Sequence, residues 1–218
     1  MISNHIITLL GMPGSGKGTQ VGILAKELGI THISTGDILR EMASGSDTEE
    51  SKLLSNYMNS GKLIPADLVN KIVKQFVDSL ESRTNCVLDG YPRNIDQAEF
   101  LSKNIDAKLT VIFFDIDRDV VVKRILGRIS CPKCGTIYNK YFNKPLKDGL
   151  CDECVSISLV SRSDDTQDTI LSRIEEYEKE TFPLIEYYNK SDIQFFTVNA
   201  NRSSDEVSQE LIAVIKNV

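Results

Sequence analysis

The sequence has no long apolar run, few histidines and no excess of positive charge. No apolar stretch approaches the eighteen or more residues of a membrane-spanning helix, so no membrane partner is expected. Residues 1–7 contain no basic region, longer apolar stretch or small-residue cleavage site, which argues against a signal peptide and predicts a cytoplasmic protein. The two histidines, His5 and His32, lie at the edges of expected strands and are predicted to be packed rather than catalytic.

Lysine and arginine number 25 against 31 aspartate and glutamate, which gives a formal net charge of -6. A chain with this balance has no overall positive field, so nucleic acid is not an expected partner. Apolar residues make up 41% and charged residues 26%, which is ordinary for a globular chain. At 218 residues, we expect one sizeable domain with an inserted subdomain, and a core that needs no disulfides.

Strand and helix signals alternate along the chain. Apolar runs predict strands at residues 5–10, 32–33, 86–88, 109–114 and 193–198. Helical periodicity predicts helices at residues 17–28, through much of 37–77, and at 94–103, 119–126, 165–188 and 203–215. The helix at 165–188 is expected to bend near Pro183. Five strands alternating with helices predict an α/β fold with a parallel sheet covered on both faces.

A glycine-rich loop joins the first strand to the first helix. Residues 11–19 read Gly-Met-Pro-Gly-Ser-Gly-Lys-Gly-Thr. Glycines let successive N–H groups point at phosphate oxygens, and the following helix adds its positive end. Lys17 is expected to reach the β- and γ-phosphates, and a nearby hydroxyl to approach Mg²⁺. Gly18 stands where Ser or Thr is usual and Thr19 follows one place later, but the strand before and the helix after favour a phosphate loop over an empty turn.

Two Cys-x-x-Cys pairs, Cys131 with Cys134 and Cys151 with Cys154, are separated by sixteen residues. Four thiolates at this spacing predict a tetrahedral zinc site, and no position is left for water or substrate, so the metal is expected to be structural. Two disulfides or idle thiols are the alternatives, which a reducing cytosol disfavours. A nucleic-acid zinc ribbon is also disfavoured, because the segment has few spare basic residues.

The glycine loop resembles that of adenylate kinases, and the resemblance continues along the chain. Segments similar to that family's motifs follow in order at residues 34–40, 61–65, 89–93 with Gln97, 124–128, and 162–165 with Arg173. Two positions depart from the family's pattern: Tyr91 replaces the more usual Phe, and Ile129 stands where a second arginine is common.

The resemblance implies a P-loop NTPase-type sheet of five parallel strands with two mobile inserted segments. The core would comprise residues 1–34, 65–126 and 166–218. Residues 35–64 would form the monophosphate-binding insert, and residues 127–165 a zinc-binding lid. Some family members carry polar residues in place of the thiols, which also implies that the zinc is structural.

The implied reaction is the reversible, Mg²⁺-dependent transfer of the terminal phosphoryl group of ATP to AMP, giving two ADP, by a monomer. Such a transfer gathers negative charge in one cleft, and arginine suits that role because its planar fork binds phosphate and stays charged. The residues expected to act in catalysis are Lys17, Arg93, Arg128, Arg162 and Arg173. Asp89, at the end of an expected strand, is expected to hold Mg²⁺ through water. The case for a role of Asp37 at the site is weaker, because a helix cap would also explain an aspartate there.

The binding residues divide between the two nucleotides. Those expected at ATP are Gly14, Ser15, Gly16, Lys17, Gly18, Thr19, Arg124, Arg128, Ile137, Tyr138 and Arg202. Those expected at AMP are Thr35, Arg40, Lys62, Leu63, Ile64, Gly90, Tyr91, Pro92, Arg93, Gln97, Arg162 and Arg173.

Two other functions stay open at this point. A kinase for another nucleoside monophosphate would share everything except the selectivity of Thr35 and Gln97. A nucleotide-dependent zinc-ribbon binding protein would keep the phosphate loop but would not need arginines from both inserts. Each arginine also has a plainer alternative, that of a surface ion-pair partner.

Overall fold

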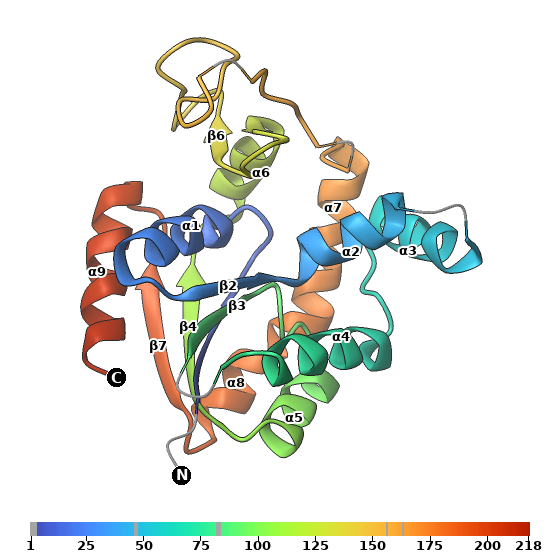
Figure 1. The fold of residues 1–218 in the computed structure, drawn as a ribbon, viewed down its shortest axis with the longest axis vertical. Coiled ribbons are helices and arrows are strands. Elements are labelled where there is room, and N and C mark those ends of the chain that lie inside the picture. The colour runs from blue at the N-terminus through green and yellow to red at the C-terminus, as the bar shows by residue number, and fades with distance from the viewer. Residues whose placement is uncertain (1–3, 46–47, 82–83, 156, 163) are drawn as a thin grey trace.

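The computed structural model describes residues 4–45, 48–81, 84–155, 157–162 and 164–218. At its centre lies a five-stranded sheet in the order β2-β3-β1-β4-β7, and every neighbouring pair is parallel (Figure 1). The strands are β1 (Asn4–Gly11), β2 (Thr31–Ser34), β3 (Asn85–Asp89), β4 (Ala107–Asp115) and β7 (Gln194–Asn199). The predicted α/β fold with a five-stranded parallel sheet is confirmed.

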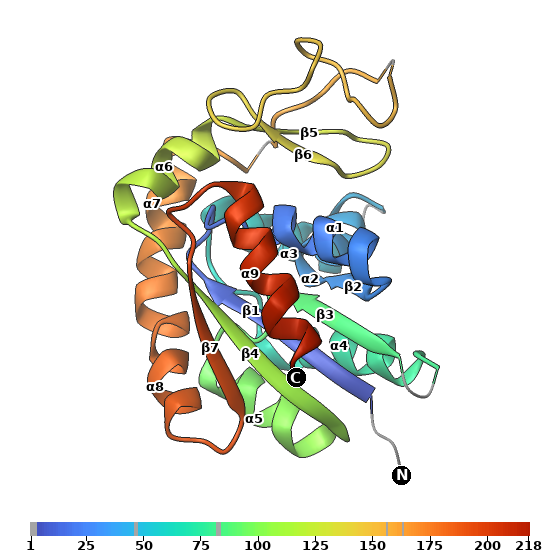
Figure 2. The ribbon, with the colours of Figure 1, turned by 90° about the vertical axis from the view of Figure 1, so that its left-hand side faces the viewer.

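Helices cover both faces of this sheet (Figure 2). They are α1 (Lys17–Leu28), α2 (Thr35–Ser44), α3 (Glu49–Ser60), α4 (Ala66–Asp78), α5 (Ile95–Asn104), α6 (Arg118–Leu126), α7 (Gln167–Glu176), α8 (Pro183–Asn189) and α9 (Ser204–Lys216). Alternate residues of β1 face opposite cores: Ile7 packs with Leu24 of α1, whereas Ile6 packs with Val73 of α4. Burial on both faces explains why apolar residues occupy consecutive positions of β1.

The predicted helix over residues 165–188 is interrupted. Helix α7 ends at Glu176, a π-helical turn, η1, covers Tyr177–Thr181, and α8 begins at Pro183. Proline has no N–H to donate, and its ring crowds the carbonyl four residues earlier, so the α-helical pattern cannot pass through Pro183. The chain instead makes a wider bond, from the N–H of Phe182 to the carbonyl of Tyr177 at 2.8 Å.

The expected lid, residues 127–165, contains a short hairpin that the sequence pattern did not predict. Strands β5 (Arg128–Ser130) and β6 (Ile137–Asn139) pair antiparallel, each only three residues long. A small separate core of Ile129, Tyr138 and two cysteines lies beneath them. A strand of three residues is too short for an alternation of apolar and polar residues to be recognised in the sequence.

The parallel topology places the carboxyl ends of all five strands at one edge of the sheet. The glycine loop follows β1, α2 begins directly after β2, and β3 ends at Asp89. The α2–α3 segment and the segment after α6 both project beyond this edge (Figure 1). Ligands of open α/β sheets bind at such an edge. Among the described residues, no helix has the length and apolar character needed to cross a membrane.

Candidate active site

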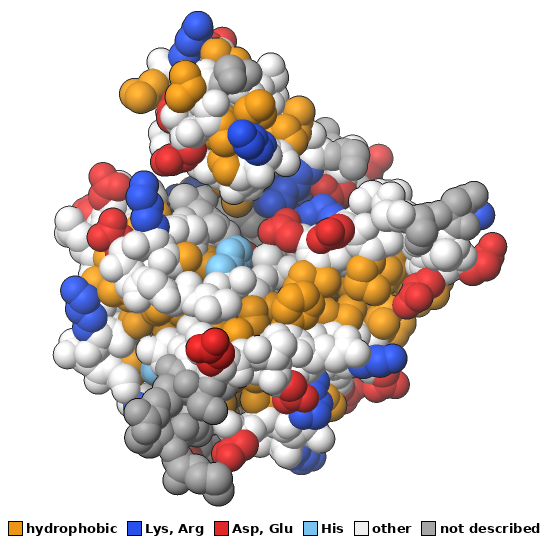
Figure 3. Space-filling view, viewed as in Figure 1, with side chains coloured by type: hydrophobic (Ala, Val, Ile, Leu, Met, Phe, Trp, Pro, Cys, Tyr) orange, Lys and Arg blue, Asp and Glu red, His pale blue; other side chains and the backbone are white. Residues whose placement is uncertain are grey.

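A cleft of about 1860 Å³ opens at the carboxyl edge of the sheet. The glycine loop forms its floor, and the α2–α3 segment and the β5–β6 segment form its walls. Lysine and arginine side chains gather in the hollow beneath the β5–β6 segment (Figure 3). The cleft is lined by all six cations that the sequence assigned to phosphates: Lys17, Arg40, Arg93, Arg128, Arg162 and Arg173.

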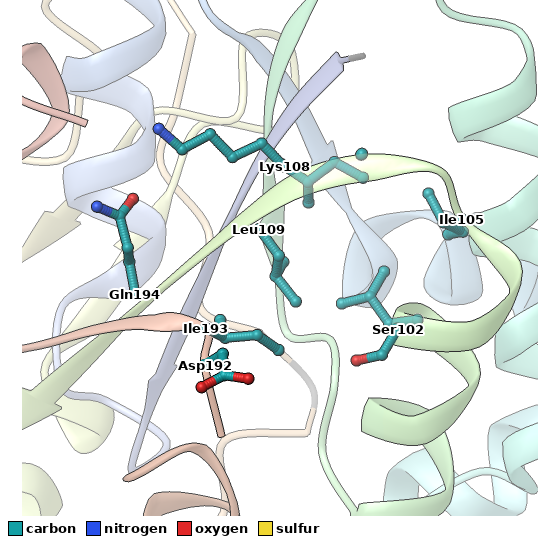
Figure 4. Close-up of a pocket in the computed structure, with 10 residues that line it drawn as sticks. Ser102, Ile105, Lys108, Leu109, Asp192, Ile193 and Gln194 are labelled. Carbon is teal, nitrogen blue, oxygen red and sulfur yellow. The ribbon is translucent and has the colours of Figure 1, made fainter. Parts of the chain in front are cut away.

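A second hollow, of about 320 Å³, lies at the opposite edge of the sheet. There Leu109 and Ile193 face Ser102 and Ile105 (Figure 4). Its lining is mainly aliphatic and includes no part of the glycine loop or the arginine motifs. The motifs expected to bind phosphate therefore lie at the larger cleft.

The glycine loop has the backbone conformation that a phosphate cradle needs. Gly14 has φ +80°, and a Cβ there would lie 2.6 Å from a side-chain carbon of Ile125, so no other residue fits. The ammonium of Lys17 donates to the carbonyl of Gly11 at 2.6 Å and to that of Met12 at 2.8 Å. Lys17 is thus held over the loop by backbone acceptors, at the start of α1.

The surroundings of Lys17 disfavour its positive charge. Burial lowers the pKa of Lys17 to about 8. Asp89 opposes this shift, whereas Arg93 and Arg128 add to it. An anion bound next to Lys17 would stabilise its positive charge, which is the behaviour expected of a residue that binds phosphate.

Two carboxylates that the sequence analysis left without a role hold the arginines at the back of the cleft. Asp165 accepts both prongs of Arg128, at 2.7 and 2.5 Å, and also pairs with Arg173 at 3.4 Å. Asp164 pairs with Arg173 from the other side. The acidic pair next to Arg162 in the sequence is the signal that could have identified them.

The remaining cations meet across the two walls. Asp37 of α2 pairs with Arg40 one turn away and lies 3.9 Å from Arg162, which belongs to the segment after the β5–β6 hairpin. The helix cap proper is Ser34, whose hydroxyl accepts from the N–H of Asp37, so the carboxylate of Asp37 is available for the arginines. Burial, reinforced by Arg128 and Arg40, lowers the pKa of Arg162 to about 10.

Ten of the twelve residues expected at AMP line the cleft. The side-chain oxygen of Gln97 accepts from the N–H of Arg93 at 2.7 Å, which leaves its NH₂ group for the cleft. The hydroxyl of Thr35 donates to the carbonyl of Asp89 at 3.0 Å. Four further expected residues line the cleft: Lys62, Leu63, Ile64 and Gly90.

Tyr91 and Pro92 are not part of the cleft lining. The Tyr91 side chain is fully buried, and its hydroxyl donates to the side chain of Asn70 at 2.7 Å. A tyrosine is therefore accommodated in place of the usual phenylalanine, because a buried polar partner satisfies its hydroxyl.

The expected ATP residues lie between the glycine loop and the hairpin. Arg124 donates to the carbonyls of Ser15 and Ala200, at 3.3 and 3.1 Å. Its guanidinium lies 5.9 Å from the centre of the Phe142 ring, an aromatic of the cleft lining that the sequence analysis missed. Tyr138, Tyr141 and Phe142 lie close together in the sequence, and nothing in that sequence indicates which of them lies near Arg124.

Three expected ATP residues have different surroundings. Ile137 overhangs the glycine loop, close to Gly18. Tyr138 lies mainly inside the hairpin's own core, where its hydroxyl accepts from the N–H of Asp152 at 2.9 Å. Arg202 lines the cleft, donates to the carbonyl of Asn199 at 3.2 Å and pairs with Glu210.

The four paired cysteines form a group that can hold a metal ion. The four Sγ atoms of Cys131, Cys134, Cys151 and Cys154 lie within 4.8 Å of one another, and all five cysteines are free thiols in this structure. A tetrahedral site with zinc–sulfur bonds of about 2.3 Å has sulfur–sulfur edges of roughly 3.8 Å. The 3.6 Å separation between Cys134 and Cys151 fits that size. The fifth thiol, Cys86, is buried in a hydrophobic core of the sheet.

The two cysteine pairs differ in the residue that follows each. In both, the N–H of that residue donates to the carbonyl of the pair's first cysteine: Gly135 to Cys131 at 3.0 Å and Val155 to Cys151 at 2.7 Å. The turn requires positive φ, which is +75° at Gly135 and 59° at Val155. A β-branched residue is strained in this region, whereas glycine is not.

Cations concentrated around a phosphate-binding loop are the mark of enzymes that move phosphoryl groups between nucleotides, which defines the class as a P-loop nucleotide kinase. A family model described as adenylate kinase matches residues 9–193. The chain is 43% identical over 211 residues to an adenylate kinase of Rickettsia rickettsii (strain Sheila Smith) and 44% identical to one of Rickettsia africae (strain ESF-5). Each alignment covers 97% of this chain and 99% of the relative.

The chain therefore belongs to the adenylate kinase family. It is a phosphotransferase that transfers the terminal phosphoryl group of ATP to AMP and gives two ADP. Adenylate kinases in general use Mg²⁺ with ATP.

Replacing Val155 by glycine is expected to stabilise the protein. The substitution removes backbone strain and little packing, since the Val155 side chain is 75% exposed. We expect the free energy of unfolding to rise by about 1 kcal/mol, measured by urea denaturation of the metal-loaded protein. Val155→Ala is the control, because alanine keeps a Cβ and most of the strain. A glycine variant no more stable than the alanine variant would contradict the assignment of strain.

Proposed function

We propose that the cleft holds both nucleotides, with ATP on the glycine loop and AMP between α2, residues 61–64 and Arg93. One observation carries this proposal: cations from the core and from both projecting segments line a single cleft. A zinc-ribbon binding protein would have no need of that convergence, and surface ion-pair partners would not gather in one place. The cleft is built by one chain, which supports a monomer.

The division of roles follows from position. Lys17 binds the β- and γ-phosphates of ATP, Arg40 and Arg93 bind the phosphate of AMP, and a third group binds the transferred phosphoryl group. That group consists of Arg128, Arg162 and Arg173. An oxygen of the AMP phosphate attacks the γ-phosphorus while the bond from that phosphorus to the β–γ bridging oxygen breaks, so ADP leaves and a second ADP forms. No protein nucleophile is needed, and catalysis rests on positioned positive charge.

Mg²⁺ bound with ATP would neutralise further phosphate charge when present. The residues that would hold it, through water, are Thr19 at the loop and Asp89 at the end of β3. Asp89 fits because its carboxylate lies within the cleft lining and close to Lys17, whose pKa it raises.

The amide of Gln97 supplies a reason for choosing adenine. Its oxygen is occupied by the N–H of Arg93, so the group it presents to a base is the NH₂ donor. Adenine offers an acceptor at N1, whereas guanine carries a hydrogen there. Thr35 at the start of α2 completes the same pocket.

We further propose three moving parts: a core of residues 1–34, 65–126 and 166–218, a monophosphate insert of residues 35–64, and a lid of residues 127–165. Arg128 and Arg162 flank the metal-binding segment, so they reach the phosphates when that segment closes. Closure also excludes water, which would otherwise accept the phosphoryl group. The expected hinges are Gly127 and Ser163–Asp164, of which Ser163 lies outside the described residues.

Zinc is the metal we assign to the four thiols, in a structural role. With all four ligands from protein, no position stays open for substrate. The lid core is small, so a metal takes the place of packing that this segment cannot provide. Free paired thiols also fit a reducing cytoplasm.

Removing a single cation should abolish most turnover without unfolding the protein. We expect Lys17→Met or Arg93→Ala to lower kcat by at least ~100-fold, because each removes charge stabilisation in a cleft that shields it from water. Steady-state assays with ATP and AMP would measure this, with circular dichroism to check the fold. Lys71→Met, on the exposed side of α4, is the matched control. A folded Arg93→Ala enzyme with near-normal turnover would refute the assignment.

Changing the amide of Gln97 to a carboxylate should shift base selectivity. In Gln97→Glu, one oxygen can still accept from the N–H of Arg93, but the other presents an acceptor to N1 of adenine. We expect kcat/KM for AMP to fall about 100-fold and the ratio of GMP to AMP activity to rise, since a donor–acceptor pair is lost and a mismatch gained. The measurement is a coupled assay across AMP, GMP, CMP and UMP. Unchanged selectivity would place the base elsewhere.

Metal removal should affect stability more than chemistry. We expect about one equivalent of zinc per chain, and a chelator should lower Tm while activity well below that Tm largely persists. Elemental analysis and thermal unfolding with and without chelator measure the two quantities. The proposed structural role would be wrong if activity vanished at once while the lid stayed folded.

A further inference from the structure

Helix α7 runs from the lid down past α2 and α3 (Figure 1). Three of its polar side chains, Thr169, Ser172 and Glu176, are spaced i, i+3 and i+7 and therefore share one face. All three bond to the backbone of the chain between the end of α3 and residue 63, which lies more than a hundred residues earlier in sequence. We call these three residues the α7 row.

The first two members hold the end of α3. The last carbonyls of a helix lack partners within the helix. Thr169 donates its hydroxyl to the carbonyl of Asn59 at 3.2 Å, and Ser172 donates to that of Ser60 at 2.7 Å. A Cβ on the next residue, Gly61, would lie 3.1 Å from the Arg173 side chain, so the two segments approach as closely as glycine permits.

The third member holds the segment to which the proposed function assigns AMP. The carboxylate of Glu176 accepts from the N–H of Leu63 at 3.2 Å. Leu63 is the middle residue of the Lys62–Ile64 stretch and lies two residues before Pro65, at the end of the monophosphate insert. A bond so near the end of a moving segment is displaced little when the segment swings, so it can persist through closure.

The same helical run also holds the other side of the acceptor pocket. At the last residue of the π-helical turn, the hydroxyl of Thr181 donates to the carbonyl of Arg93 at 2.7 Å. Arg173, between Ser172 and Glu176, lines the cleft. One continuous unit, α7 with η1, thus bonds to the backbone of both Leu63 and Arg93 and also carries Arg173.

We propose that Glu176 is a positioning residue for the acceptor nucleotide, acting through the backbone of Leu63, with Thr169 and Ser172 anchoring the adjoining end of α3. This inference rests on the proposed placement of AMP at Lys62–Ile64. Glu176 is not assigned any contact with the reacting atoms. Its hydrogen bond holds the backbone groups of residues 62–64 in the arrangement that receives the base, so its loss weakens AMP binding and leaves ATP binding and the chemical step unchanged.

Steady-state kinetics of four variants test the proposal. In Glu176→Ala the acceptor for the Leu63 N–H is lost, and we expect KM for AMP to rise about tenfold, with KM for ATP and kcat within about twofold of the parent. Glu176→Gln keeps an oxygen acceptor without the charge and should restore KM for AMP. Glu176→Asp keeps the charge but shortens the reach, and should resemble the alanine variant. Glu175→Ala, at the exposed neighbouring position, should resemble the parent.

The outcomes separate this inference from the proposed function. If Gln97→Glu raises KM for AMP but neither Glu176→Ala nor Glu176→Asp does, the positioning role is wrong and the placement of AMP stands. If Gln97→Glu and the Glu176 variants all leave KM for AMP unchanged, the placement of AMP is wrong and the inference falls with it. A Glu176→Gln enzyme as impaired as Glu176→Ala would show that charge is what counts, which also overturns the proposal. Thermal unfolding of each variant identifies any loss of fold, and Glu176→Asp carries the test if the alanine variant is unstable.

Discussion

Repulsion between like charges is the constraint on which the rest of this structure depends. The six cations expected at the phosphates all line one cleft, and burial together with repulsion between cations lowers the pKa of Lys17 to about 8 and that of Arg162 to about 10. Among the described residues, fewer carboxylates pair with these arginines: Asp37 and Asp165 each pair with two of them, and Asp164 pairs with Arg173. Positive charge is left over, and phosphate groups are its natural complement. Binding of the nucleotides therefore reduces the repulsion between the cations of the folded protein.

This constraint also explains the architecture. A parallel sheet brings the ends of its strands to one edge, but a single edge cannot enclose two nucleotides from all sides. The missing cations come from segments inserted after β2 and after α6, which project over the edge. The second of these has only a two-stranded hairpin and a small core, and four thiols stand where a longer segment would have packed side chains. A metal held by these thiols would provide rigidity without adding length to the segment.

Local sequence patterns predicted the parts of the fold that local physics decides. The buried strands, the glycine loop and the cysteine pairs are each specified by contiguous residues, and each is found where expected. The roles assigned to individual side chains stay predictions, although all six cations reach one cleft. The π-helical turn before Pro183 was not predicted. A proline indicates that a helix is interrupted, but not which backbone conformation the residues before it adopt. The bonds from α7 to residues 59–63 join groups over a hundred positions apart, and a backbone N–H carries no sequence signal.

The arginines and the acidic residues beside them have different roles: the arginines bind phosphate, and the carboxylates hold the arginines in position. Asp165 neutralises part of the charge of Arg128 and Arg173, which by itself would weaken phosphate binding. Long side chains without such partners would sample many rotamers in water, and ordering each of them on binding would cost about 1–2 kcal/mol. Electrostatic catalysis depends on dipoles and charges that are already in place when the transition state forms. Asp165, which pairs with two guanidinium groups, therefore weakens their attraction for phosphate but holds both side chains in place before the nucleotides bind. Helix α7 orders backbone in the same way. It carries Arg173, and its side chains bond to the backbone at the end of α3 and at Leu63.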